Sequence, residues 1–212
     1  MRAVAATLSM LVVVLMLAQP VLAGKSSNMV TLVDAEHDLM KYNANFMYYG
    51  LGVCQPWPVN SPVQTAEYLD MEGASIEKQR DTFVLTLTMY CDDLLADVEM
   101  PIGGEQNPQI AWTHYLVNLD DGSDYLIGVW WDGSKMSPLD LCPNLKWEMT
   151  AADTITMWID EDVMGDPSSI AWSPGVLLDV APVWLPTFGG WWWVDMPDNY
   201  VGGDSGYYFW PA

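Results

Sequence analysis

The stretch Thr82–Tyr90, which reads TFVLTLTMY, decides the fold class. Apolar residues occupy every second position, with Phe83, Leu85, Leu87 and Met89 in one row and more polar residues in the other. Side chains of a β-strand point alternately to its two faces, so this pattern predicts a strand with one buried face. The row of four apolar residues is therefore expected to lie in a hydrophobic core.

A hairpin is predicted downstream of this strand. Gln109–Leu119 and Tyr125–Trp131 read as two antiparallel strands, joined by an acidic turn that contains Gly122. Alternation assigns the two adjacent tryptophans to opposite faces, with Trp131 beside Tyr125, Ile127 and Val129, and Trp130 beside Leu126 and Gly128.

The rest of the chain continues the pattern of short strands and turns. Further strands are expected near 68–78, 136–139, 145–150, 154–159, 169–172 and 191–196. Few helices are expected: a turn or two at Val33–Tyr42 and a brief turn at Glu161–Gly165. Many short strands with regular turn signals predict an all-β fold, an antiparallel β-sandwich of jelly-roll or immunoglobulin-like architecture. The Gly- and aromatic-rich tail, about 197–212, is expected to close the sandwich as an irregular segment.

The first 23 residues have the pattern of a signal peptide. Arg2 precedes the apolar run Leu8–Leu17, and the small residues Val21 and Ala23 fit cleavage before Gly24. An uncleaved membrane anchor is the alternative interpretation. The predicted mature protein, 24–212, is a single secreted domain, extracellular or periplasmic, that can associate with the cell envelope and has no stable membrane insertion after signal cleavage.

The charge balance limits the classes of partner. The chain has 7 Lys+Arg against 28 Asp+Glu, a formal net charge of −21. Such a surface repels phosphate backbones and anionic lipids, so nucleic-acid binding is excluded from the expected functions. Cations are attracted instead, and a salt-rich habitat could produce the same bias.

Three cysteines, Cys54, Cys91 and Cys142, follow the predicted signal peptide. Export makes one disulfide plausible and leaves one thiol over, and the sequence does not determine the pairing. Their spacing matches no CxxC zinc pattern.

Tryptophan is the compositional oddity, with 12 in 212 residues. Exposed flat rings can stack on sugar rings, whereas buried rings pack in sandwich cores. A single core is not expected to hold every ring, and an aromatic surface patch usually marks an interaction site. Trp130, Trp158 and Trp192 are the predicted ligand-binding platforms.

The acidic turn is a candidate calcium site. Asp120, Asp121 and Asp124 supply hard oxygen ligands of the kind that Ca²⁺ prefers, although the spacing is not that of an EF-hand. The alternative is a purely structural turn, because Asp and Gly are the commonest hairpin-turn residues. A second possible oxygen cluster comprises Asp34, Glu36 and Asp38.

No catalytic constellation is indicated. Gly203–Gly206 (GDSG) resembles the nucleophile motif of trypsin-like proteases, but neither His37 nor His114 has the expected context, so a turn is predicted. His114 lies mid-strand, where an edge or satisfied histidine is favoured over a haem or copper ligand. The chain is therefore expected not to be an enzyme.

Several motifs in series resemble those of exported β-sandwich domains similar to family 9 carbohydrate-binding modules and DOMON-type domains. The matching pieces span most of 34–196: Asp34-x-x-x-Asp38, Tyr68-Leu-Asp-Met71, Asp81-Thr-Phe-Val-Leu-Thr-Leu, Tyr115-Leu-Val-Asn-Leu-Asp120, Ser123-Asp-Tyr-Leu-Ile127, Asp153-Thr-Ile-Thr-Met and Val163-Met-Gly165. The resemblance implies a sandwich fold, with sugar and calcium binding in the first group and haem or sugar binding in the second. No ligand motif transfers residue by residue, so the likeness is one of fold.

Together these features predict a non-catalytic secreted module that recognises a carbohydrate or a cell-surface partner through exposed aromatics. Bound Ca²⁺ is a possible stabiliser of its acidic loops. The alternative is a structural or assembly protein of an extracellular or envelope complex, whose aromatic patches associate with copies of itself or with a partner.

Overall fold

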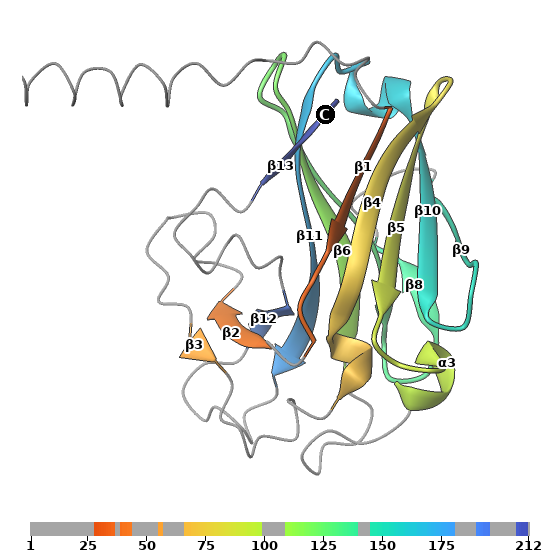
Figure 1. Ribbon diagram of the computed structural model, residues 1–212, viewed down its shortest axis with the longest axis vertical. Coiled ribbons are helices and arrows are strands. Elements are labelled where there is room, and N and C mark those ends of the chain that lie inside the picture. Colours follow the sequence, from red (N-terminus) through yellow and green to blue (C-terminus); the bar gives the residue numbers. More distant parts are fainter. Residues whose placement is uncertain are drawn as a thin grey trace, which may run out of the picture.

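The computed structural model describes residues 28–36, 39–43, 55–56, 66–98, 109–139, 145–180, 190–195 and 207–211. Within these ranges the chain forms two antiparallel sheets that pack face to face (Figure 1). The predicted all-β sandwich is confirmed. The predicted signal peptide, His37, Cys54, Cys142 and the GDSG motif lie outside the described residues.

The first sheet has five strands in the order β1-β4-β5-β10-β9. Their bounds are β1 (Met29–Val33), β4 (Met71–Gln79), β5 (Thr82–Met89), β10 (Thr154–Asp160) and β9 (Lys146–Met149). The expected strands at 82–90, 145–150 and 154–159 are therefore present, and the one at 68–78 begins later because a 3-10 helix, η2 (Glu67–Leu69), precedes it.

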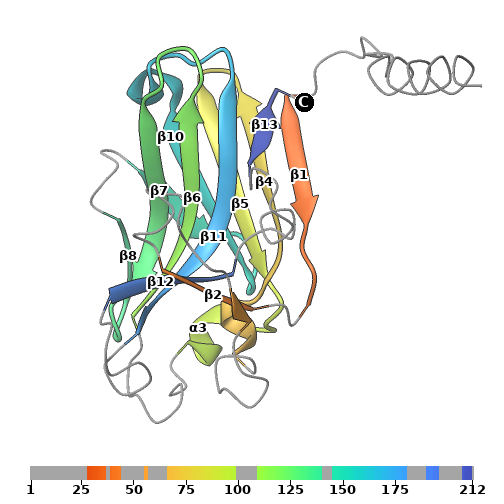
Figure 2. The ribbon, with the colours of Figure 1, turned by 90° about the vertical axis from the view of Figure 1, so that its left-hand side faces the viewer.

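The second sheet has eight strands, seven of them in the order β3-β2-β12-β11-β6-β7-β8, while β13 pairs with β11. Their bounds are β3 (Gln55–Pro56), β2 (Met40–Asn43), β12 (Gly190–Asp195), β11 (Ile170–Val180), β6 (Ile110–Asn118), β7 (Asp124–Trp131), β8 (Met136–Pro138) and β13 (Tyr208–Trp210). Figure 2 looks onto this sheet and shows β7, β6 and β11 side by side, with β13 between β11 and β1.

The core fills the space between the two sheets. In β5 the predicted row is buried, with Phe83, Leu85 and Leu87 each 0% exposed. Alternate residues of β10 likewise point into the space between the sheets, where inward-pointing residues of the other sheet are buried too. The buried members of this core include Met89, Ile155, Met157 and Ile159 from the first sheet and Trp112, Leu116, Ile127, Val129, Trp131, Ile170 and Trp172 from the second.

The expectation of a helical turn at Val33–Tyr42 is wrong. Val33 ends β1, which pairs with β4, and Met40–Asn43 forms β2, which pairs with β12 and β3. Sheet pairing has overridden a weak local signal. The brief turn at Glu161–Gly165 is confirmed as a 3-10 helix, η3 (Glu161–Met164), while a short helix, α3 (Leu94–Asp97), was not expected.

The C-terminal tail is less irregular than expected, because Tyr208–Trp210 forms β13 on the edge of β11. Trp210 is 6% exposed and meets the Phe83 ring edge-on, with ring centroids 4.8 Å apart. Its indole N–H donates to the Asn28 carbonyl at 2.9 Å. This strand thus fastens the eight-stranded sheet to the first strand of the other sheet.

Candidate functional site

Three strands bring two tyrosines and a serine together on the outer face of the eight-stranded sheet. The register of β11 and β6 places Ser173 opposite Tyr115. The register of β11 and β13 pairs Trp172 with Tyr208, so the next residue, Tyr207, comes beside Ser173 from the other side. Because Trp172 belongs to the core, alternation turns Ser173 to the outer face.

The rings of Tyr115 and Tyr207 converge above Ser173. Their centroids are 6.2 Å apart and their planes are tilted by 44°. The Tyr115 hydroxyl donates a hydrogen bond to Oδ2 of Asp124 at 2.9 Å. Burial, and then the negative charge of Asp124, raise the pKa of Tyr207, so its phenol stays neutral at ordinary pH. We call Tyr115, Asp124, Ser173, Tyr207 and Phe209 the tyrosine site.

Ser173 forms the floor of the tyrosine site. Its side chain is 2% exposed, and its Oγ has no hydrogen-bond partner within the described part of the chain. A buried hydroxyl without a partner costs about 1–3 kcal/mol relative to one that is satisfied. An alanine at this position would avoid that cost, so the hydroxyl is not explained by packing.

Apolar side chains surround the site on the same face. Phe209 is 55% exposed and lies in one register row with Ala171, Val117 and Asp124. Val117, Leu126 and both tyrosines are half-buried. The site is therefore an aromatic surface with one carboxylate at its border.

Two residues after Leu126 in β7, at Gly128, another side chain covers the outer face of the sheet. A Cβ on Gly128 would lie 2.9 Å from a methyl of Leu139 and 2.6 Å from the Trp112 carbonyl oxygen. Glycine is required here because Leu139 folds across the sheet. This separates the tyrosine site from Trp130, which is half-buried on the same face and pairs with Ala111 and Ser137.

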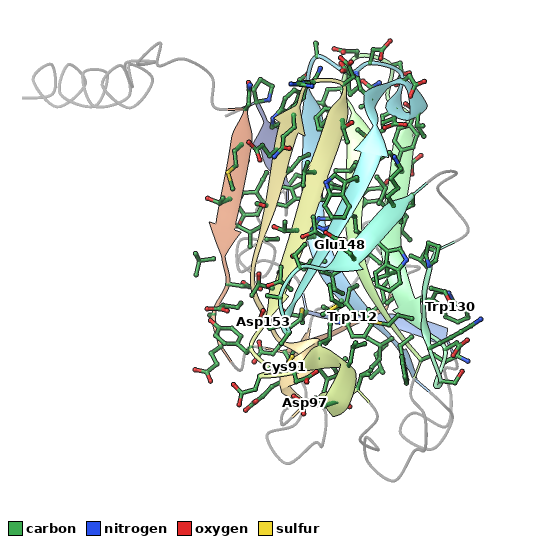
Figure 3. The ribbon with its side chains drawn as sticks, turned by 90° about the vertical axis from the view of Figure 1, so that its right-hand side faces the viewer. Cys91, Asp97, Trp112, Trp130, Glu148 and Asp153 are labelled. Atoms are coloured by element: carbon green, nitrogen blue, oxygen red, sulfur yellow. The ribbon has the colours of Figure 1, made fainter. Side chains whose placement is uncertain are left out.

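The three predicted tryptophans do not form one platform. Trp158 is half-buried on the outer face of the five-stranded sheet, opposite the buried Ile155 and Met157, as its alternation predicted. Trp130 faces outward from the other sheet, so the two rings point in opposite directions. Figure 3 shows Trp130 at one side of the domain, apart from Glu148 of β9. Trp192 lies in β12, and its side chain is outside the described residues.

The three predicted calcium ligands accept hydrogen bonds from three different residues. Asp120 accepts from the backbone and side chain of Ser168, at 2.6 and 2.7 Å. Asp121 accepts from the backbone and side chain of Ser123, at 2.8 and 2.6 Å, and Asp124 accepts from Tyr115. The hydrogen bonds from Ser168 and Ser123 lower the pKa of Asp120 and Asp121.

The acidic turn also has a structural counterpart elsewhere in the sheet. Asp132-Gly133-Ser134 repeats Asp121-Gly122-Ser123: in both turns the carboxylate accepts from the serine amide and hydroxyl. Both glycines have positive φ, 78° at Gly122 and 92° at Gly133. The recurrence supports the structural interpretation of the acidic turn.

No group of three or more His, Cys, Asp or Glu within the described ranges is arranged to hold a metal ion. In the second predicted oxygen cluster, Asp34 is buried at 4% exposure and Glu36 is exposed, while Asp38 lies outside the described residues. Calcium binding stays a prediction.

An acidic hollow marks one end of the sandwich. It has a volume of about 400 Å³ and is lined by Asp81, Thr82, Asp160, Glu161, Asp162 and Asp166. Lys78 pairs with Glu161 at its border. Together with the net charge of −21, it makes this end of the domain repel anions.

Two reactive residue types are held inert by burial. Burial, followed by the charge of Asp97, raises the pKa of Cys91 to about 12, and its thiol is free. Burial lowers the pKa of His114 to about 3, so its imidazole is neutral. His114 is a core residue on the central strand β6, where its Nδ1 accepts from the Trp172 indole at 3.0 Å.

Sequence reasoning missed most of the tyrosine site. It chose Asp124, but as a metal ligand, and it did not choose Tyr115, Ser173, Tyr207 or Phe209. The available signal was alternation: Tyr115 follows the core position His114, and the Tyr207-Tyr208 pair lies in an aromatic tail. Nothing local indicates that the tail pairs with β11.

Comparisons of this chain with protein-family models, with curated proteins and with solved structures gave no match. The resemblance to family 9 carbohydrate-binding modules and DOMON-type domains therefore stays a prediction. In the described ranges, no helix combines the length and apolar character needed to cross a bilayer.

Proposed function

We propose that this chain is an exported, non-catalytic binding module that recognises a carbohydrate, or a glycan-bearing cell-surface partner, through aromatic rings on its outer faces. The tyrosine site carries this proposal. It combines two tilted rings, an exposed Phe209, a carboxylate and a hydroxyl within one small surface.

Sugar recognition needs that combination of groups. An aromatic ring has a negative face, which attracts the weakly positive C–H groups on the face of a sugar ring. A carboxylate such as that of Asp124 can accept hydrogen bonds from sugar hydroxyls, and a few such polar groups fix orientation. Half-buried tryptophans at Trp130 and Trp158 provide further stacking surface on both sheets.

Two observations support a role without catalysis. The thiol of Cys91 is buried and its raised pKa keeps it protonated, so it is a poor nucleophile. The imidazole of His114 is 0% exposed and cannot reach a substrate at the surface.

A second candidate function is assembly with a partner or with another copy of the chain. Phe209 at 55% and Leu119 at 48% exposure are large apolar side chains that contact with another protein would cover. The high negative charge opposes self-association, so sugar binding is preferred.

A glycan screen tests the proposal. The intact mature chain is titrated with soluble neutral and anionic polysaccharides, with tryptophan fluorescence and calorimetry as readouts, and its size is followed by gel filtration over a range of concentrations. Saturable binding of a neutral glycan by a monomer is expected. Absence of binding across the panel, with concentration-dependent growth in size, would favour assembly instead.

A further inference from the structure

We infer that the tyrosine site is an aromatic clasp, in which a neutral sugar ring enters between Tyr115 and Tyr207 and hydrogen-bonds to the hydroxyl of Ser173. This assignment rests on the proposed function and specifies its location and ligand class. The sequence did not indicate it, since Tyr115, Ser173 and Tyr207 are distant from one another along the chain.

Ser173 is the first reason for the assignment. Ser173 lies between the two tyrosines in the register of the strands, and its buried Oγ has no hydrogen-bond partner among the described residues. On the other sheet, the outer-face hydroxyls of Ser75 and Thr86 bond to each other at 2.5 Å, and those of Thr150 and Thr156 at 2.7 Å. Because the outer-face hydroxyls of the other sheet are paired, the unsatisfied hydroxyl of Ser173 is best explained by a partner from outside the chain.

The attachment of β13 lets the clasp open. Trp210, at one end of this short strand, is held by Phe83 and by its bond to the Asn28 carbonyl. Tyr207 lies just before the other end and meets Tyr115 through ring contact. Rotation of the Tyr207 ring would uncover Ser173 while leaving the Trp210 anchor in place.

Charge selects the ligand. Asp124 borders the clasp and bonds to Tyr115, and the whole chain is strongly acidic. A phosphate, a sulfate or a uronic acid would be repelled. A neutral sugar offers a C–H face to the rings and hydroxyls to Ser173 and Asp124.

The test uses the full mature chain and soluble neutral oligosaccharides of glucose, mannose, galactose and N-acetylglucosamine, with affinity measured by calorimetry for the tightest binder. Tyr207→Ala and Ser173→Ala should each weaken binding about tenfold or more, since one lost buried hydrogen bond or ring contact has that effect. Tyr207→Phe, which keeps the ring, should bind almost as the natural chain does.

Melting temperature separates binding from folding. Ser173→Ala removes an unsatisfied buried hydroxyl, so its melting temperature should be unchanged or higher although its affinity falls. Thr86→Ala, which removes a hydroxyl from the outer face of the other sheet, is the matched control and should leave affinity unchanged.

Two outcomes would overturn the clasp, and they are distinguishable. If the natural chain binds a neutral oligosaccharide and neither Tyr207→Ala nor Ser173→Ala weakens that binding, the proposed function survives and the clasp is wrong. If the natural chain binds none of the oligosaccharides, the proposed function and the clasp both fail.

Discussion

Two adjacent strands, β6 and β11, build one cluster inside the sandwich and another outside it from consecutive residues. Inside, the Trp172 indole donates to His114 Nδ1, and the rings stack with centroids 6.0 Å apart. Outside, their sequence neighbours Ser173 and Tyr115 join Tyr207 in the tyrosine site. A step of one residue thus moves a polar-aromatic cluster from the core to the surface.

Each cluster contains a buried polar atom without a partner in the described part of the chain, and the difference lies in what can reach it. His114 is 0% exposed and lies on the core face of β6 with Trp112 and Leu116, so the missing hydrogen bond of its Nε2 can affect only stability. Ser173 lies on the outer face between two half-buried tyrosines, so a ligand can satisfy its Oγ. The inner cluster should therefore control folding, and the outer one binding.

The largest expected effect comes from truncating the inner cluster. Trp172→Ala removes a fully buried indole and should cost about 3–5 kcal/mol of unfolding free energy, measured by urea denaturation. Tyr115→Ala, on the half-buried outer side of the same sheet, should cost about 1 kcal/mol. Equal losses for the two variants would contradict the division between the clusters.

Acid should destabilise the fold through His114. Because burial holds the folded pKa near 3, below the unfolded value of 6.5, only the unfolded chain takes up this proton as the pH falls through that window. His114's contribution to stability is complete above pH 6.5 and should fall by about 2 kcal/mol by pH 4.5.

His114→Gln is the control for this acid effect. It keeps an acceptor for the Trp172 indole but has no proton to gain, so its urea midpoint should change less between pH 6.5 and 4.5. The carboxylates with lowered pKa are Asp120, Asp121 and Asp132, and their contributions to stability are lost below pH 4.5, as they become protonated. An unchanged pH profile in His114→Gln would show that another group controls the acid response.

A smaller difference in stability is expected between two variants that each remove a hydroxyl from an outer face. Thr86→Ala breaks the bond to Ser75 Oγ and should cost about 1 kcal/mol. Ser173→Ala breaks no hydrogen bond with the described chain and should cost nothing, so the two variants differ in the sign or size of their melting-temperature shifts. A matching loss of stability in both would mean that Ser173 has an internal partner.

The smallest expected effect is that of calcium. Asp120, Asp121 and Asp124 each already bond to a different donor, so a chelator should leave the melting temperature unchanged. A rise of several degrees on adding Ca²⁺, reversed by chelator, would instead establish the predicted cation site.

Period-two alternation was sufficient for the fold but not for the site. It placed Phe83, Leu85 and Leu87 in the core and turned Trp130 and Trp131 to opposite faces, because strand geometry fixes those directions locally. It failed at 33–42, where long-range pairing decides the structure.

The tyrosine site depends on the same kind of long-range information. Tyr207 meets Tyr115 only because β13 pairs with β11, and a three-residue strand in a glycine-rich tail gives no local sign of its partner. The predicted binding platforms were single tryptophans, chosen because tryptophan is abundant in the sequence. The tyrosine site instead combines tyrosine, serine, aspartate and phenylalanine side chains. Asp124 was chosen for its charge, and the structure gives it a tyrosine as partner.

The opposed orientation of Trp130 and Trp158 has a consequence for materials rather than for single molecules. Rings on the outer faces of opposite sheets cannot bind the same rigid polymer strand at once, so they add no avidity toward it. If each ring holds a separate strand, however, one small domain becomes a bridge between two, and a solution of polymer and protein should thicken instead of merely saturating.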